Sequence, residues 1–191
     1  MAELPDWMRP PRPEGWLAED LDNLPDAPRH TELIDGALVF MMSPQRNWHR
    51  RVIKALDNAL NDQAPEGIEV NSEMTVRLDK YNRPEPDVIA STVSIAHDAT
   101  CYEAEDIVLA VEVVSPESEH RDRAVKPQKY AGAGIRHFWR VEDEDSQAAT
   151  TIHVYELDDL TRTYVPIGIF RDVLKVDLPF PIELDVQGLY G

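Results

Sequence analysis

Residues 107–114 read IVLAVEVV, and this stretch decides the fold that we expect for the chain. Seven of its eight residues are apolar, a pattern typical of a central β-strand that is covered on both faces. Residues 118–133 then have helical character, although Pro127 should split or restart that helix, and Gly132 and Gly134 should close it. Another strand is expected over residues 135–141. Strand, helix and strand in this order predict an α+β domain.

The rest of the chain extends this pattern in both directions. A hairpin is predicted over residues 31–42, with Asp35-Gly36 as its turn. A helix should begin at Ser43-Pro44, with the serine as N-cap, and end at Pro65. Further strands are expected at residues 68–78, 87–90, 150–156, 163–170 and 173–178. Four prolines in residues 1–14 predict an extended arm there, which leaves residues 15–191 as a single domain.

The amino-acid composition excludes several classes of protein. The 191 residues are 42% hydrophobic and 29% charged, as in a soluble globular protein, and no apolar stretch is long enough to span a membrane. The N-terminal sequence MAELPDWMRPPRPEGW lacks the apolar core of a signal peptide, so a cytoplasmic location is expected. Cys101 is the one cysteine, which excludes an internal disulfide and a zinc site built from thiolates.

The net charge of −17 argues against a general affinity for nucleic acid, but the charge is unevenly distributed. Residues 43–56 contain four basic and no acidic residues, and residues 120–140 contain six basic residues and one acidic residue. These two segments could bind a polyanion at one face of the molecule while the acidic remainder repels it elsewhere. Two solvated basic surfaces are the alternative.

Glu112 is a carboxylate inside the most apolar strand of the chain. An unpaired buried charge costs several kcal/mol, so this side chain needs a metal ion, a cation or a proton. A position at the solvent-exposed end of the strand, or a salt bridge to a core arginine, would also explain a glutamate in this run. Asp87 enters a second apolar run, Val88-Ile89-Ala90, directly after Pro86. An aspartate at the start of a strand can also be a turn residue.

The two carboxylates are more informative as a pair than singly. If their strands are neighbours, Asp87 and Glu112 can converge on one divalent cation, with a backbone carbonyl near Val113 as a third oxygen ligand. Hard oxygen ligands suit Mg²⁺ or Mn²⁺ better than zinc.

Three quoted segments together resemble a known family. TELIDGALV is followed by SP and His49, RPEPDVIA contains Asp87, and LAVEVVSPESEHRDRAVKPQKYAGAGIRHFWRV contains Glu112. Over roughly residues 30–142 the chain resembles the Uma2 family of restriction-endonuclease-like proteins, within the PD-(D/E)XK nuclease superfamily. The resemblance implies a restriction-endonuclease-like core, a central mixed sheet flanked by helices, and metal-dependent cleavage of phosphodiester bonds in nucleic acid.

Carried over to this chain, the resemblance makes Asp87 and Glu112 the metal ligands and catalytic carboxylates. The superfamily lysine should follow the glutamate by two residues, where this chain has Val114. The resemblance places its replacement on the following helix, at Lys126 rather than Lys129. Such an amine could orient or deprotonate the attacking water. An ordinary surface lysine is the alternative.

The resemblance also brings residues from earlier in the chain to the site. Glu32 would join the acidic cluster as a metal ligand or a supporting acid, unless it is an exposed strand residue. His49 lies on the apolar arc of its helix, where a core role is common, but the resemblance places it near the site. Basic side chains should hold the nucleic-acid backbone without specifying sequence, and we assign His49, Arg50, Arg121, Arg123 and Lys129 to this role.

These expectations combine into a Mg²⁺- or Mn²⁺-dependent endonuclease whose partner is nucleic acid, with DNA favoured and a two-fold homodimer expected if both strands of a duplex are cut. The competing hypothesis is a nuclease fold without turnover that acts in nucleic-acid or protein binding. The departure at Val114 and the net charge of −17 favour that alternative. Glycoside hydrolysis also uses two carboxylates, but the 7% aromatic content disfavours it.

Overall fold

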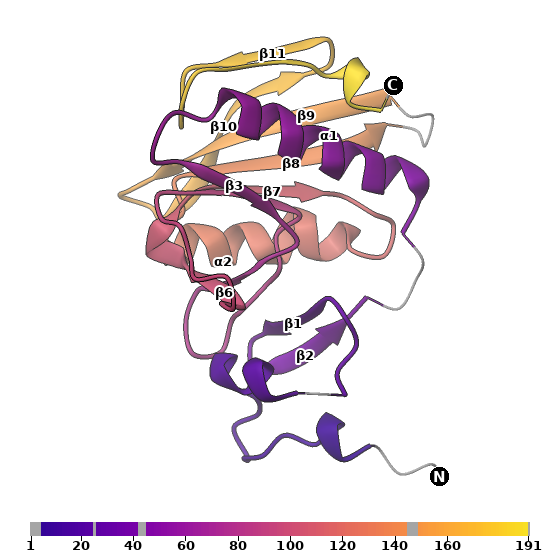
Figure 1. Cartoon of the computed structure of the whole chain (residues 1–191), viewed down its shortest axis with the longest axis vertical. Helices are drawn as coiled ribbons and strands as arrows, with labels where there is room; N and C mark the ends of the chain where they lie inside the picture. The colour runs from indigo at the N-terminus through magenta and orange to yellow at the C-terminus, as the bar shows by residue number, and fades with distance from the viewer. Residues whose placement is uncertain (1–4, 25, 42–44, 145–148, 191) are drawn as a thin grey trace.

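The computed structural model describes residues 5–24, 26–41, 45–144 and 149–190 (Figure 1). Its centre is a six-stranded sheet in the order β10-β9-β8-β7-β5-β3. The strands are β3 (Glu69–Ser72), β5 (Val88–Ser91), β7 (Ile107–Val113), β8 (His137–Glu144), β9 (Ala149–Asp158) and β10 (Thr163–Phe170). Strands β7 and β8 are parallel, and the other neighbouring pairs are antiparallel. The predicted central mixed sheet is confirmed.

Strand β7 is buried on both faces, as its apolar run predicts. Leu109, Val111 and Val113 belong to the core shared with helix α1 (Asn47–Gln63). Ala110 belongs to the core on the other face, with Tyr130 of helix α2 (Lys126–Ala133). Because successive side chains alternate across a strand, Glu112 points to the same face as Ala110, toward α2.

The connection from β7 to β8 runs through an interrupted helix. Residues Arg121–Val125 form a π-helical turn, in which the Lys126 N–H bonds to the Arg121 carbonyl five residues back. Helix α2 then begins at Lys126 with Pro127 in its first turn, so the expected restart at the proline is confirmed. Gly134 ends the helix in the left-handed conformation, with φ of 92°.

An N-terminal layer lies beside this central sheet (Figure 1). It contains the hairpin of β1 (Thr31–Ile34) and β2 (Ala37–Phe40), whose turn residues Asp35 and Gly36 both have positive φ. The short helices Asp6–Met8 and Ala18–Asn23 precede it. Leu33 exchanges backbone hydrogen bonds with Arg83, of 3.0 and 2.8 Å, and this pairing ties the hairpin to the segment that leads into β5. The domain boundary expected at residue 14 stays a prediction.

Two predicted boundaries are wrong. Helix α1 begins at Asn47, because Arg46 has extended backbone angles; the expected start, Ser43-Pro44, lies outside the described residues. The strand expected over residues 68–78 is two strands, β3 and β4 (Thr75–Arg77), because Glu73 takes a positive φ of 55° between them. Strand β4 pairs with β6 (Cys101–Glu103).

The C-terminal strands form a small hairpin over the α1 face. Strand β11 (Val173–Val176) pairs with β12 (Ile182–Asp185), and a short helix, Gln187–Leu189, follows. Leu174 and Ile182 enter the core that contains α1. Within the described ranges, none of the helices has the length and apolar character needed to cross a membrane.

Candidate active site

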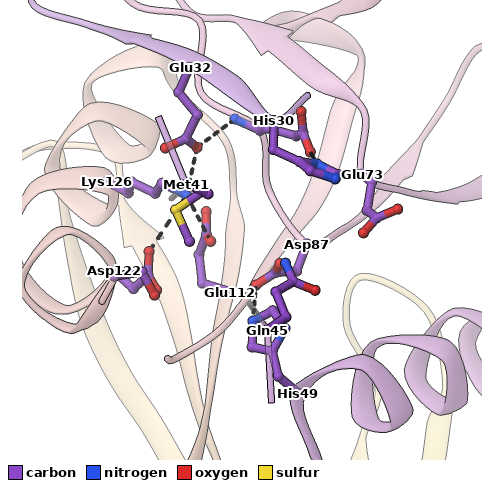
Figure 2. A pocket seen from close by; sticks show the side chains of 12 residues that line it. His30, Glu32, Met41, Gln45, His49, Glu73, Asp87, Glu112, Asp122 and Lys126 are labelled. Carbon is purple, nitrogen blue, oxygen red and sulfur yellow. Dashed lines mark hydrogen bonds and ion pairs between the residues drawn. The ribbon is translucent and has the colours of Figure 1, made fainter. Parts of the chain in front are cut away.

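The sheet register brings Asp87 and Glu112 to the same place. Val88 of β5 is paired with Val111 of β7 in antiparallel register; Asp87 directly precedes Val88, and Glu112 directly follows Val111. Both carboxylates line one pocket at this end of the sheet (Figure 2). The juxtaposition on which the predicted metal site depends is therefore present.

Glu112 is 1% exposed, and both of its oxygens have partners. The Tyr130 hydroxyl donates to Oε1, and Lys126 Nζ lies 3.0 Å from Oε2. Burial raises the pKa of Glu112 well above its usual range, and the charge of Lys126 opposes that rise. The buried carboxylate thus has a cationic partner, but it is a lysine and not the arginine considered from the sequence.

Lys126 lies among three carboxylates. Its Nζ is 2.8 Å from Glu32 Oε1, 3.0 Å from Glu112 Oε2 and 3.5 Å from Asp122 Oδ1 (Figure 2). Burial alone lowers the pKa of this ammonium, but the surrounding acids, Glu112 first, outweigh burial and raise the pKa well above the ordinary lysine value. Lys126 is therefore charged at neutral pH.

Asp122 is a member of the pocket that the sequence analysis missed. It is 1% exposed, and its Oδ1 has no hydrogen-bond partner apart from the ion pair with Lys126. Burial raises the pKa of Asp122, and Lys126 opposes the rise. The spacing Asp122, Lys126, Tyr130 could have revealed it, because residues four apart share one face of a helix.

Asp87 lies on the other side of the pocket, next to α1 (Figure 2). Its Oδ2 accepts a 2.6 Å hydrogen bond from the Val113 N–H and is 3.7 Å from His49 Nε2. Its side chain is 16% exposed, so it is more accessible than Glu112. Burial raises the pKa of Asp87 well above the usual range, with Lys126 as the main opposing charge.

Glu32 reaches the pocket from the N-terminal hairpin. It is 3% exposed, and its Oε1 accepts a 2.8 Å hydrogen bond from the Glu85 N–H in addition to the Lys126 contact. The interpretation of Glu32 as an exposed strand acid is therefore wrong, because β1 is held against the segment before β5.

The residues assigned to nucleic-acid binding are dispersed. His49 lines the pocket and is buried, and burial lowers its pKa, so it is neutral at physiological pH. Arg50 is exposed on α1, and Arg121 contacts Met41 Sδ at 3.1 Å. Arg123 forms ion pairs with two glutamates, and Lys129 pairs with an aspartate of the β1–β2 turn. Arg50, Arg121, Arg123 and Lys129 do not line the acid pocket.

The family assignment follows from a comparison that covers most of the chain. Residues 18–187 match the Uma2 family, whose description is "putative restriction endonuclease". The chain belongs to the Uma2 family. A similar solved structure is the crystal structure of "a putative nuclease belonging to DUF820 from Anabaena variabilis ATCC 29413". It has a TM-score of 0.70 and 15% identity over 90% of this chain and 96% of that chain, which shows a common fold. Among curated proteins, no relative matches this chain.

The donor set of this Uma2 protein fits a hard divalent cation. Within the described ranges, no three or more His, Cys, Asp and Glu side chains form a group arranged to hold a metal ion. Mg²⁺, however, commonly binds through one or two carboxylates and keeps several waters. Asp87 and Glu112 supply such carboxylates, and Asp122 Oδ1 is a buried oxygen without a hydrogen-bond donor. Neutral His49 also borders Asp87.

Proposed function

We propose that this Uma2 protein is a metal-dependent endonuclease that hydrolyses phosphodiester bonds in nucleic acid. The observation that carries the proposal is the shared pocket of Asp87, Glu112 and Lys126, with Lys126 Nζ 3.0 Å from Glu112. Two carboxylates and a charged amine at one sheet end suit phosphoryl transfer, in which positioning and charge stabilisation supply most of the catalysis. Family membership supports the same reaction class.

Asp87 and Glu112 would hold Mg²⁺ or Mn²⁺, with the Val113 carbonyl as a further oxygen ligand. When bound there, the cation supplies Lewis-acid chemistry, which means that it stabilises negative charge on the phosphate and lowers the pKa of a coordinated water. The Asp87 side chain is more accessible than that of Glu112, so substrate would approach from the side of Asp87.

Lys126 has a role that follows from its charge. Because the surrounding acids keep its amine protonated, it would not take the proton from the attacking water, contrary to one of the roles expected from the sequence. Its ammonium would instead direct the N–H that is not bonded to Glu32 or Glu112 to a phosphate oxygen and stabilise the charge that develops there. Glu32 and Asp122 would hold that ammonium in position.

Nucleic acid, with DNA favoured, is the proposed partner. The exposed Arg50 on α1 and the neighbouring Arg46 are the basic residues best placed to contact the strand, because Arg46 borders the hollow next to His49. Such contacts would hold the phosphate backbone without reading bases. A cytoplasmic location and a homodimer remain part of the proposal.

The experiment is nicking of a supercoiled plasmid in Mn²⁺ by the wild type, by Glu112→Gln and by a matched control, Glu183→Gln. Glu183 is 61% exposed on β12 and pairs with Lys175, so its loss of charge is remote from the pocket. We expect Glu112→Gln to lose about 100-fold in activity, as when one charge-stabilising group is removed, and Glu183→Gln to match the wild type. Equal activity of all three proteins would contradict the proposal.

A binding module without turnover is the second candidate, and the ion pairs of two basic residues favour it. Arg123 and Lys129 are both held by carboxylates, which leaves fewer free cations to bind a substrate. Thermal melting in Mg²⁺ or Mn²⁺ distinguishes the candidates. A melting temperature that is indifferent to either metal, together with an intact plasmid, would favour the binding module.

A further inference from the structure

A larger hollow lies beside α2, outside the acid pocket. Its volume is about 720 Å³, compared with about 30 Å³ for the acid pocket. The smaller space suits an ion or a water, whereas the larger is typical of sites that bind organic ligands. A nucleotide base would therefore find room in this groove, whereas the space among the acids suits an ion, a water or a phosphate oxygen. One wall of the groove is α2, and the other is formed by β8, β9 and the start of β10.

The sheet side of the groove is aromatic. Phe138 stacks with Tyr155 at a centroid distance of 5.7 Å and with Tyr164 at 5.4 Å, and the interplanar angles are 29° and 26°. Phe138 is 1% exposed and supports the two tyrosines from within the core, while both tyrosines are partly exposed. The helical wall presents small side chains, Ala124 of the π-helical turn and Ala131 of α2. Because both tyrosines are partly exposed, a base could contact the open part of either ring.

The groove is also lined by cations. Arg123, Arg140 and Arg162 line it, and none of the described residues that line it is an aspartate or a glutamate. The Arg140 guanidinium lies 5.6 Å from the centre of the Tyr155 ring. Glu142, just outside the lining, pairs with both Arg123 and Arg140 at 2.5 Å. Arg123 also pairs with Glu119, so two of the three guanidinium groups are balanced by carboxylates and Arg162 carries the positive charge of this surface.

Arg162 is the guanidinium most available to a ligand. It donates a 3.3 Å hydrogen bond to the Gly132 carbonyl at the end of α2, and it has no carboxylate partner among the described residues. Its side chain is exposed, and its guanidinium lies against the Gly134 backbone. A phosphate could bind to it without displacing a buried ion pair.

The groove is linked to the acid pocket by shared residues. His49 lines both the acid pocket and an intermediate hollow at the N-terminus of α1, and Arg123 lines both that hollow and the groove. That intermediate hollow, which Glu119, Glu142 and Asp143 also line, lies between the acid pocket and the groove, and a flexible strand that reaches both would pass over it. A continuous duplex is too wide and too stiff to place a base flat against Tyr155.

We propose that the groove between α2 and strands β8–β10 binds an unpaired nucleotide, with its base on Tyr155 and Tyr164 and its phosphate on Arg162, within a single-stranded segment of the substrate. This inference rests on the proposed nuclease function, and it narrows the substrate to nucleic acid with an unpaired stretch beside the cleaved bond. The aromatic surface supplies affinity without base identity, since every base has a π-face.

The test measures binding separately from cleavage. A fluorescein-labelled oligothymidylate of about 12 nucleotides, a length typical of single-strand sites, is titrated with the full chain in EDTA and followed by fluorescence anisotropy. Tyr155→Leu should weaken binding about fivefold or more through lost stacking, and Tyr155→Phe should restore it. Arg162→Gln should weaken binding about threefold or more. Lys175→Gln, which removes a charge from β11 on the α1 face, is the matched control and should bind as the wild type does.

Several results would overturn the inference. Binding that is indifferent to both Tyr155→Leu and Arg162→Gln would place the strand elsewhere, even if the protein nicks plasmid. Equal competition by a duplex of the same length, or by thymidine monophosphate, would contradict the assignment to a single strand. If Tyr155→Leu fails to fold, the effect of Arg162→Gln, a substitution at an exposed residue, and the two competition experiments still test the inference. Plasmid nicking and oligothymidylate binding in EDTA are separate readouts, so failure of the nuclease proposal and failure of this inference give different results.

Discussion

Lys126 balances the charge of the acid pocket. Burying Glu32, Glu112 and Asp122 together without a cation would carry a large desolvation cost, and their mutual repulsion would add to it. The single ammonium lies within 3.5 Å of all three. The residue that we assign to catalysis is therefore also one on which the folded state depends.

Lys126→Met should destabilise the protein by about 3–5 kcal/mol at neutral pH, because removal of one partner leaves buried carboxylates unpaired. Lowering the pH should reduce the loss, since protonation of the acids removes the uncompensated charge. Urea unfolding at two pH values measures both effects. Lys175→Met, at an exposed lysine paired with Glu183, is the control and should leave the stability close to that of the wild type. A loss for Lys126→Met no larger than that of the control would contradict this account.

His30, which also lines the acid pocket, forms a contact that depends on pH. Its Nδ1 lies 2.5 Å from Glu85 Oε1, and although burial lowers the pKa of His30, Glu85 outweighs burial and raises it. A raised histidine pKa stabilises the fold below the ordinary imidazole value, and that stability is lost as the pH rises through the folded value. His30→Asn tolerates the positive φ of 59°.

We therefore expect the wild type to exceed His30→Asn in stability at about pH 5.5, and the difference to shrink by about pH 9. The effect should stay below about 1 kcal/mol, because the His30 side chain is 35% exposed. Urea unfolding of both proteins across this range checks the sign. A difference that grows as the pH rises would contradict the assignment of the ion pair.

At the scale of elements, the end of α2 offers a matched pair of glycines. Gly134 has a φ of 92°, which a residue with a Cβ adopts at a cost, whereas Gly132 is helical and a Cβ added there meets nothing within 4 Å. Gly134→Ala should destabilise the protein by about 1–2 kcal/mol, and Gly132→Ala should stabilise it by up to about 1 kcal/mol. Denaturant midpoints measure both. The same sign for the two substitutions would show that the helix does not end as described.

Patterns within single elements predicted much of this architecture. The apolar run of β7 correctly indicated a strand buried on both faces, and Pro127 correctly marked the restart of α2. The division between β3 and β4 was missed because it depends on Glu73, whose N–H donates a 3.2 Å bond to the Asp87 carbonyl. That contact is tertiary, and no local periodicity encodes it.

The sequence predicted most of the residues of the site, but it did not predict which of them contact one another. Glu112 stands out as a carboxylate in an apolar run, but its neighbours come from β1, the segment before β5, and α2. The register that brings Glu32 to Lys126 depends on the backbone pairing of Leu33 with Arg83. From the sequence, Arg123 and Lys129 were expected to be free to bind nucleic acid. In the structure each forms an ion pair with a carboxylate from a distant segment.

At the scale of the whole molecule, the acid pocket lies where three units meet. The central sheet supplies Asp87 and Glu112, α2 supplies Lys126, and the N-terminal layer supplies Glu32 (Figures 1 and 2). Most of the surface charge is negative, so an approaching polyanion would be repelled except near the arginines around α1 and α2. Binding of a divalent cation at the pocket would also reduce that repulsion locally.

The most direct test of the central claim is a calorimetric titration of Mn²⁺ into the wild type, Asp87→Asn and Glu183→Gln. We expect one strong site per chain in the wild type and in Glu183→Gln, and a loss of affinity of about 10-fold or more in Asp87→Asn. Equal Mn²⁺ affinity in all three proteins, or no Mn²⁺ binding by the wild type, would contradict the assignment of Asp87 and Glu112 as the ligands of a catalytic metal.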